Sequence, residues 1–203
     1  MIEQIEWLGH ASFRIQGSPV FYIDPWKIVR DSLRAEVILI SHDHYDHCSP
    51  GDVDKLRESE TQVIVSAASA ALIPDAVVLR PWQIMTFGRT CLKAIPAYNE
   101  AHPQSREGLG FLISIGFYDL YYAGDTGLIP EMDMLKPDIA ILPISGKHTM
   151  NIGEAVQAVQ RMRPRWVIPS HWGTAGEGAS VADARDFANA LKGISEVILP
   201  EQG

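Results

Sequence analysis

The chain has 203 residues, 46% of them apolar, and its 17 basic and 25 acidic side chains give a formal charge of −8. A chain of this length buries about 70% of its surface on folding, so its core needs neither disulfides nor a structural metal, and we expect one domain over residues 1–203. The acidic charge disfavours nucleic acid as a partner, and the absence of a long apolar run or a basic leader predicts a soluble, cytoplasmic protein without a membrane partner.

Short apolar or alternating runs, several of them followed by Gly, Pro or Asp, predict β-strands. In chain order they cover residues 3–8, 12–16, 20–23, 37–40, 62–65, 91–96, 110–115, 120–123, 139–142, 166–168 and 196–199. Capping residues predict three helices, which begin after Ser49, Asn151 and Ser180; the last two end near Pro164 and Gly193. A strand-rich first half with helices later in the chain indicates a layered α/β fold with mixed sheets.

Three of the seven histidines, His42, His44 and His47, fall within six positions directly after the apolar strand at 37–40. Functional sites are often built on loops held by such a scaffold. Where the chain is nearly extended, residues two apart point the same way, so His42 and His44 can face one ion while Asp46 and His47 face a second. Imidazole and carboxylate ligands suit Zn, Fe or Mn, and the motif therefore predicts metal binding.

Two further candidate ligands follow apolar strands later in the chain. Asp125 comes after the strand at 120–123, where Gly124 allows a tight turn, and His171 comes after the strand at 166–168. An Asp in a surface turn and a structural His are the alternatives at these two positions.

The segment His42-x-His44-x-Asp46-His47 after a strand resembles the signature of the metallo-β-lactamase superfamily. Other segments resemble landmarks of its small metal-dependent hydrolases, a subgroup that includes the ascorbate-6-phosphate lactonase-like proteins. In chain order these segments are Trp7-Leu8-Gly9-His10-Ala11, Ile23-Asp24-Pro25, Gly124-Asp125-Thr126, Leu142-Pro143-Ile144 and Pro169-Ser170-His171-Trp172-Gly173. The resemblance runs from about residue 5 to residue 175.

This resemblance implies an αββα sandwich of two mixed β-sheets with a binuclear metal site at one edge. It assigns His42 and His44 to the first ion, Asp46 and His47 to the second, Asp125 to a bridging position and His171 to the second ion. The superfamily often has a third histidine for the first ion directly after a strand, but this chain departs from that pattern with Tyr98-Asn99. His102, which we prefer, and His148 are the alternatives; if neither binds, that ion is held weakly. Asp24 resembles the carboxylate that hydrogen-bonds a ligand histidine in this family. Four further residues are expected near the substrate or the ligands: His10, Tyr98, Asn99 and His148.

The expected cofactors are two divalent ions, with zinc preferred and Mn or Fe as alternatives. Ions about 3.5–4 Å apart hold a water and lower its pKa toward neutrality. We therefore expect an enzyme in which metal-bound hydroxide cleaves a small ester, lactone, amide or phosphodiester, with Asp46 as the catalytic residue that orients the hydroxide and relays its proton. Only 32 residues follow His171, too few for an appended domain, which favours a small-molecule substrate.

Two other functions remain open from the sequence. A metal-stabilised binding module would keep the same fold without turnover. A di-iron oxidoreductase is the less favoured alternative, because that branch of the fold usually has Glu where this chain has His44 and needs a flavin partner domain. The sequence leaves the oligomeric state undefined.

Overall fold

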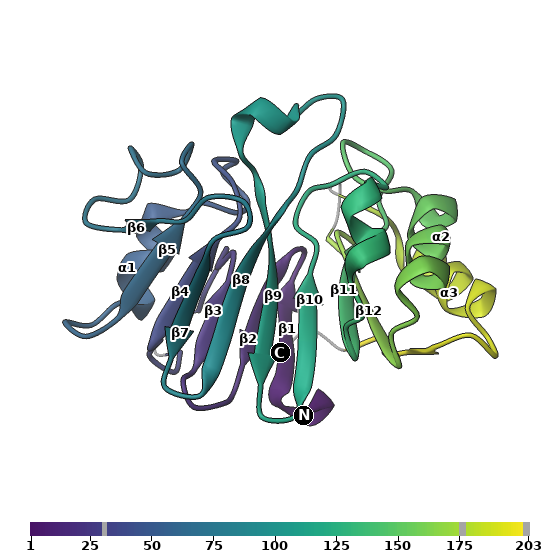
Figure 1. Ribbon diagram of the computed structural model, residues 1–203, viewed down its shortest axis with the longest axis horizontal. Helices are drawn as coiled ribbons and strands as arrows, with labels where there is room; N and C mark the ends of the chain where they lie inside the picture. The colour runs from purple at the N-terminus through teal and green to yellow at the C-terminus, as the bar shows by residue number, and fades with distance from the viewer. Residues whose placement is uncertain (30–31, 175–177, 201–203) are drawn as a thin grey trace.

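The computed structural model describes residues 1–29, 32–174 and 178–200, which form two β-sheets packed face to face (Figure 1). The first sheet contains, in spatial order, β1 (Ile5–Gly9), β2 (Ser12–Ile15), β3 (Phe21–Ile23), β4 (Val37–Ile40), β5 (Gln62–Val65) and β6 (Val77–Val78). The second contains β13 (Glu196–Val197), β12 (Trp166–Ser170), β11 (Ile139–Pro143), β10 (Tyr118–Tyr122), β9 (Leu109–Ile115), β8 (Thr90–Pro96) and β7 (Ile84–Phe87). Both sheets mix parallel and antiparallel pairs.

Strand alternation separates two apolar layers on either side of the first sheet. Val37 and Leu39 of β4 belong to the core between the sheets, whereas Ile38 and Ile40 of the same strand pack in a second cluster. Ile38 and Ile40 share that face because side chains two apart on a strand point the same way. The second cluster also includes Val53 and Leu56 of helix α1 (Pro50–Leu56). Helix α1 therefore covers the outer face of the first sheet.

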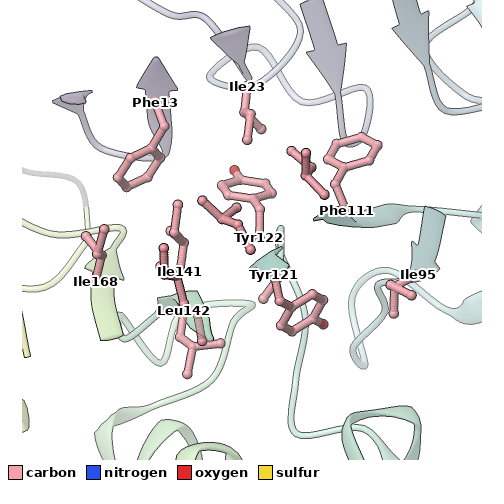
Figure 2. Packing of buried hydrophobic residues seen from close by; sticks show 14 of the residues in the cluster. Phe13, Ile23, Ile95, Phe111, Tyr121, Tyr122, Ile141, Leu142 and Ile168 are labelled. Atoms are coloured by element: carbon pink, nitrogen blue, oxygen red, sulfur yellow. The ribbon is translucent and has the colours of Figure 1, made fainter. Parts of the chain in front are cut away.

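Side chains of the second sheet also alternate between its two faces. Figure 2 shows Tyr122 of β10 directed toward Phe13 and Ile23, while its neighbour Tyr121 points to the opposite side. The Phe13 and Tyr122 ring centroids lie 6.2 Å apart across the two sheets. Helices α2 (Ile152–Met162) and α3 (Val181–Ala190) lie beside β11 and β12 (Figure 1) and join the same core through residues such as Val159. The expected αββα sandwich with two mixed sheets is confirmed.

The helix starts predicted from capping residues are confirmed. Helix α2 begins with a capping box between Asn151 and Glu154, and α3 begins with one between Ser180 and Asp183. At α1 the cap works differently: the Ser49 hydroxyl donates to the Asp52 carboxylate over 2.8 Å instead of accepting from the helix backbone. Three short 3-10 helices complete the described elements: η1 (Ile2–Gln4), η2 (Gln104–Arg106) and η3 (Pro130–Met134).

Several strand predictions need correction. Strands β6 and β7 are absent from the prediction because they lie at sheet edges and are largely exposed, so they lack a buried run. The first strand begins at Ile5, since Ile2–Gln4 form a 3-10 turn, and β12 continues through Pro169, which pairs with Leu142. Strand β13 ends at Val197, where its pairing with β12 ends.

The topology brings several loops to one edge of the sandwich. Strands β1, β3 and β4 run in one direction in the first sheet, and β8, β10, β11 and β12 do so in the second. Two backbone hydrogen bonds join the sheets at this edge: Leu109 N–H, at the start of β9, donates to the Ser41 carbonyl, and His171 N–H donates to the His10 carbonyl, each over 3.0 Å. The β8–β9 connection with η2 projects at this edge, uppermost in Figure 1. Among the described helices, none has the length and apolar character that a membrane crossing requires.

Candidate metal centre

The loops at this edge bring together the candidate ligands from both halves of the chain. Residues 41–47 follow β4, where Cys48 N–H donates to the His44 carbonyl over 2.7 Å and folds the loop back on itself. Asp125 follows β10, and His171 follows β12 with a backbone φ of +58°. Gly124 has a φ of +66°, as the tight turn before Asp125 requires.

The first group of ligand atoms comes from His42, His44 and Asp125, whose nearest donor atoms all lie within 4.8 Å of one another. His102 lies beside this group, with its ring centroid 4.2 Å from that of His44 and 5.5 Å from that of His42. Asn99 Oδ1 accepts the His102 backbone N–H over 2.8 Å, which folds the loop after β8 back toward the group. The preferred third histidine is thus within the cluster.

The second group surrounds the other oxygen of the Asp125 carboxylate. Asp125 Oδ1 lies 2.6 Å from His171 Nε2 and 3.3 Å from His47 Nε2. Asp46 Oδ2 lies 3.9 Å from His47 Nε2. His10, which the sequence placed only near the ligands, also has a ring nitrogen within 4.8 Å of the donor atoms of His47 and His171.

Unpartnered buried atoms test whether this donor set fits a metal. Within the described residues, six buried atoms of the cluster have no hydrogen-bond partner: His10 Nδ1, His42 Nε2, His47 Nε2, His102 Nδ1, Asp125 Oδ1 and His171 Nε2. Each such atom costs about 1–3 kcal/mol when left unpaired, so a concentration of them at one place calls for a ligand. Imidazole nitrogens and a carboxylate oxygen are the donors that divalent transition metals prefer, and the residues therefore fit two such ions.

Burial and charge act against each other in the metal-free cluster. Burial lowers the pKa of His42 well below its ordinary value, with the neighbouring His47 adding to the effect. Burial also opposes charge on His47, yet Asp125 and Asp24 raise the pKa of that imidazole to about 9. Against burial, His171 and His47 hold the pKa of Asp125 well below its usual range. A metal bound at His47 must therefore displace a proton.

Asp24 orients the His47 ring through its Nδ1 atom. Its fully buried carboxylate accepts from His47 Nδ1, the Ser41 backbone N–H and the Tyr122 hydroxyl, each over 2.7 Å. Because Nδ1 carries the hydrogen, Nε2 is left to face the cluster. The sequence identified Asp24 for this position but missed Ser41 and Tyr122; the alternation of β10 is the signal that could have directed Tyr122 inward.

The remaining predicted residues lie around the cluster in different ways. Asn99 Nδ2 donates to the backbone carbonyls of Asp125 over 3.2 Å and His148 over 2.6 Å, so it joins two loops. The Tyr98 hydroxyl instead donates to Glu131 of η3, which is not one of the candidate ligands, over 2.9 Å. His148 is exposed, with a φ of +60°.

One cavity borders the cluster, and a second shares Lys147 and His148 with it. The smaller, of about 180 Å³, is lined by His10, His44, Tyr45, Asp46, Asp125, Ser145, Lys147, His148, His171 and Gly178. A larger one of about 820 Å³ lies on the other side of Lys147 and His148, and Tyr98 and Asn99 line it as well. Neither Tyr45 nor Lys147 was selected from the sequence, because nothing local to an exposed side chain shows that it borders a cavity.

The two-sheet sandwich and its His/Asp cluster define a protein of the metallo-β-lactamase class. Residues 4–171 match the family model described as the beta-lactamase superfamily domain. A UPF0173 metal-dependent hydrolase from Carboxydothermus hydrogenoformans is 32% identical over 219 aligned positions, covering 97% of each chain. The chain thus belongs to the metallo-β-lactamase superfamily and, within it, to the UPF0173 metal-dependent hydrolases.

Solved structures share the fold. A protein described as a metal-dependent hydrolase from Parabacteroides distasonis superposes with a TM-score of 0.86 at 26% identity, covering 98% of this chain and 93% of its own. CmlA, a diiron β-hydroxylase from Streptomyces venezuelae, superposes with a TM-score of 0.73 at 16% identity, with 97% of this chain covering 52% of that one. The fold alone therefore does not select hydrolysis, and these comparisons do not single out a lactonase.

Proposed function

We propose that this protein is a hydrolase that uses two divalent metal ions, zinc by preference, to cleave a small ester, lactone, amide or phosphodiester. The observation that carries the proposal is the convergence of two ligand groups on one carboxylate. Asp125 Oδ1 lies beside His47 and His171, and Asp125 Oδ2 lies 3.7 Å from His42 Nε2. Asp125 would thereby bridge the two ions, and His102 would complete the first group.

The chain's own residues hold the reacting groups in place. Ions bound by these ligands would supply Lewis acidity and make a water molecule more acidic. Asp24 keeps His47 Nε2 directed at the cluster, and Asn99 holds the Asp125 loop. Asp46 borders the smaller cavity, where its carboxylate accepts the proton of the attacking water.

The cavities support a small substrate. About 180 Å³ beside the ligands has room for the scissile group, and the neighbouring groove of about 820 Å³ has room for the rest of the molecule on the far side of Lys147 and His148. The formal charge of −8 also favours a small molecule over nucleic acid. The family name and the histidine-rich cluster favour hydrolysis over the oxidoreductase alternative.

The proposal is tested with the purified protein stripped of metal and reloaded with Zn²⁺, Mn²⁺ or Fe²⁺. Each form is assayed on a p-nitrophenyl ester, an aryl lactone, an anilide and bis(p-nitrophenyl) phosphate. We expect chelator-sensitive hydrolysis of at least one of them, and a loss of at least about 100-fold in kcat for Asp46→Ala. Asp54→Ala, at an exposed position on α1, is the control and should keep full activity.

Two results would contradict it. Hydrolysis that persists unchanged after complete metal removal excludes the metal-dependent mechanism. A fully metallated protein that turns over none of the four substrate types supports a metal-stabilised binding module instead.

A further inference from the structure

His10 lies between the two halves of the candidate metal centre. It occupies the turn between β1 and β2, only 2% exposed, with a backbone φ of +51°. A non-glycine residue in this left-handed region costs about 1–2 kcal/mol, so specific contacts must hold it there. Such contacts come from both its main chain and its side chain.

The main chain of His10 binds the C-terminal half. Its carbonyl oxygen accepts the backbone N–H of His171 and the indole N–H of Trp7, each over 3.0 Å. The Trp7 ring in turn stacks on Trp172, with centroids 4.6 Å apart and planes 4° from parallel. These contacts fix the backbone from which the His171 imidazole reaches Asp125.

The side chain of His10 hydrogen-bonds Asp46 of the N-terminal half and packs against rings from both halves. His10 Nε2 lies 3.0 Å from Asp46 Oδ2, and the ring packs 5.4 Å from that of Trp26 and 4.2 Å from that of His171. Because an ionised carboxylate only accepts hydrogen bonds, the nitrogen that faces Asp46 carries the hydrogen. A nitrogen that carries hydrogen has no lone pair for a metal, so His10 Nε2 acts here as a donor to a candidate ligand, while His10 Nδ1 is buried without a hydrogen-bond partner.

We propose that His10 is a positioning residue that aims the Asp46 carboxylate at the ion held by His47 and His171. Two segments that are 36 residues apart in the chain meet in this one hydrogen bond. Partners of this kind, which hydrogen-bond a metal ligand from outside, contribute about 10–100-fold to metal affinity. The inference rests on the proposed two-ion centre but does not depend on the reaction or its substrate.

Two substitutions separate this hydrogen bond from the rest of the turn. In His10→Gln the side-chain amide nitrogen takes the place of Nε2 and can still donate to Asp46. In His10→Asn the amide nitrogen takes the place of Nδ1 and cannot reach Asp46. Both keep a polar side chain, and Asn tolerates a positive φ well, so the turn should form in each.

The experiment is a titration of the metal-free protein with Co²⁺ against a competing chelator, with the visible absorption of bound cobalt recorded at each step. We expect His10→Asn to weaken one of the two binding steps by about 10–100-fold and leave the other unchanged, and His10→Gln to recover most of the loss. Asp54→Ala, at an exposed position on α1 away from the cluster, is the control and should bind cobalt like the parent. Far-UV circular dichroism checks the fold of every variant.

Two outcomes would overturn the proposal. Equal cobalt affinities in His10→Asn and the parent mean that the contact does not position Asp46. An equal loss in His10→Gln and His10→Asn, with a changed cobalt spectrum, means that His10 is itself a ligand. Neither outcome bears on hydrolysis, which is measured separately, so failure of this inference and failure of the proposed function are distinguishable.

Discussion

At the residue scale, the position of Asp125 depends on the glycine before it. Gly124 combines a φ of +66° with a close approach to the β9 backbone: a Cβ atom there would lie 2.7 Å from the Leu109 carbonyl oxygen. Gly116, in the β9–β10 turn, has a similar φ of +62° but open space around it. Substitution of Gly116 therefore reports only the cost of a left-handed backbone, whereas substitution of Gly124 adds the cost of a steric clash.

We expect Gly116→Ala to lower the free energy of unfolding by about 1 kcal/mol, because only the backbone conformation is strained. Gly124→Ala should cost about 2 kcal/mol more, since the turn must also move away from Leu109. That movement carries Asp125 with it, so metal affinity should fall in Gly124→Ala and remain unchanged in Gly116→Ala. Urea unfolding and metal titration measure the two effects, and equal behaviour of the two variants would show that the turn has room to adjust.

At the element scale, helix α1 is anchored by one acidic side chain. Asp52 accepts the backbone N–H groups of Lys27 and Ile28 over 2.9 and 3.1 Å, together with the Ser49 hydroxyl and the Lys55 ammonium group. Burial alone would raise the pKa of Asp52, but the hydrogen bonds from Lys55, Ser49 and Lys27 lower this pKa below its ordinary value. The helix is thus tied to the segment that follows β3.

We expect Asp52→Asn to lower the free energy of unfolding at pH 7 by about 2 kcal/mol, because bonds to a charged acceptor are lost. Since the folded-state pKa is depressed, this contribution is present above the unfolded value near 3.8 and disappears as pH falls through the folded value. The difference in free energy of unfolding between the parent and Asp52→Asn should therefore become smaller as the pH falls from 7 to 3, as urea unfolding at each pH would show. Asp54→Asn, on the exposed face of the same helix, should change stability little at either pH; a gap for Asp52→Asn that is independent of pH would contradict this account.

At the scale of the whole molecule, the metal centre joins elements that the core already holds. Ligand candidates come from the loops after β4, β8, β10 and β12, whereas the apolar core between the sheets includes fully buried side chains such as Phe13, Phe111 and Tyr122. The core therefore does not depend on the ions, and metal binding should add stability to a structure that is already folded.

We expect the chelated protein to keep its far-UV circular dichroism spectrum and to melt at a lower temperature than the metallated protein. Free metal at 100 times its dissociation constant adds about 2.7 kcal/mol, equivalent to roughly 5–10 °C for a chain of this size. His171→Ala should lose most of that metal-dependent shift while retaining the spectrum. Loss of secondary structure on chelation would show instead that the fold needs the ions.

The sequence by itself determined the layers, most helix boundaries and the central metal motif. The buried strand runs and the capping residues at Asn151 and Ser180 are local signals that predict a layered α/β fold, and the family resemblance implies the sandwich. His42, His44 and His47 lie so close in the chain that their proximity in space follows from their spacing. The edge strands β6 and β7 escaped prediction because their side chains are mostly exposed and carry no buried pattern.

Only the tertiary structure decided which distant residues meet at that motif. Asn99 returns the loop after β8 so that His102 lies beside His44, and the pairing of His10 with Asp46 depends on the turn between β1 and β2 reaching the loop after β4. Such contacts depend on strand direction and loop conformation, and those are fixed by packing across the whole sandwich. Local sequence does not determine such contacts. The sequence therefore did not decide between His102 and His148 as the third histidine, and it gave His10 no partner.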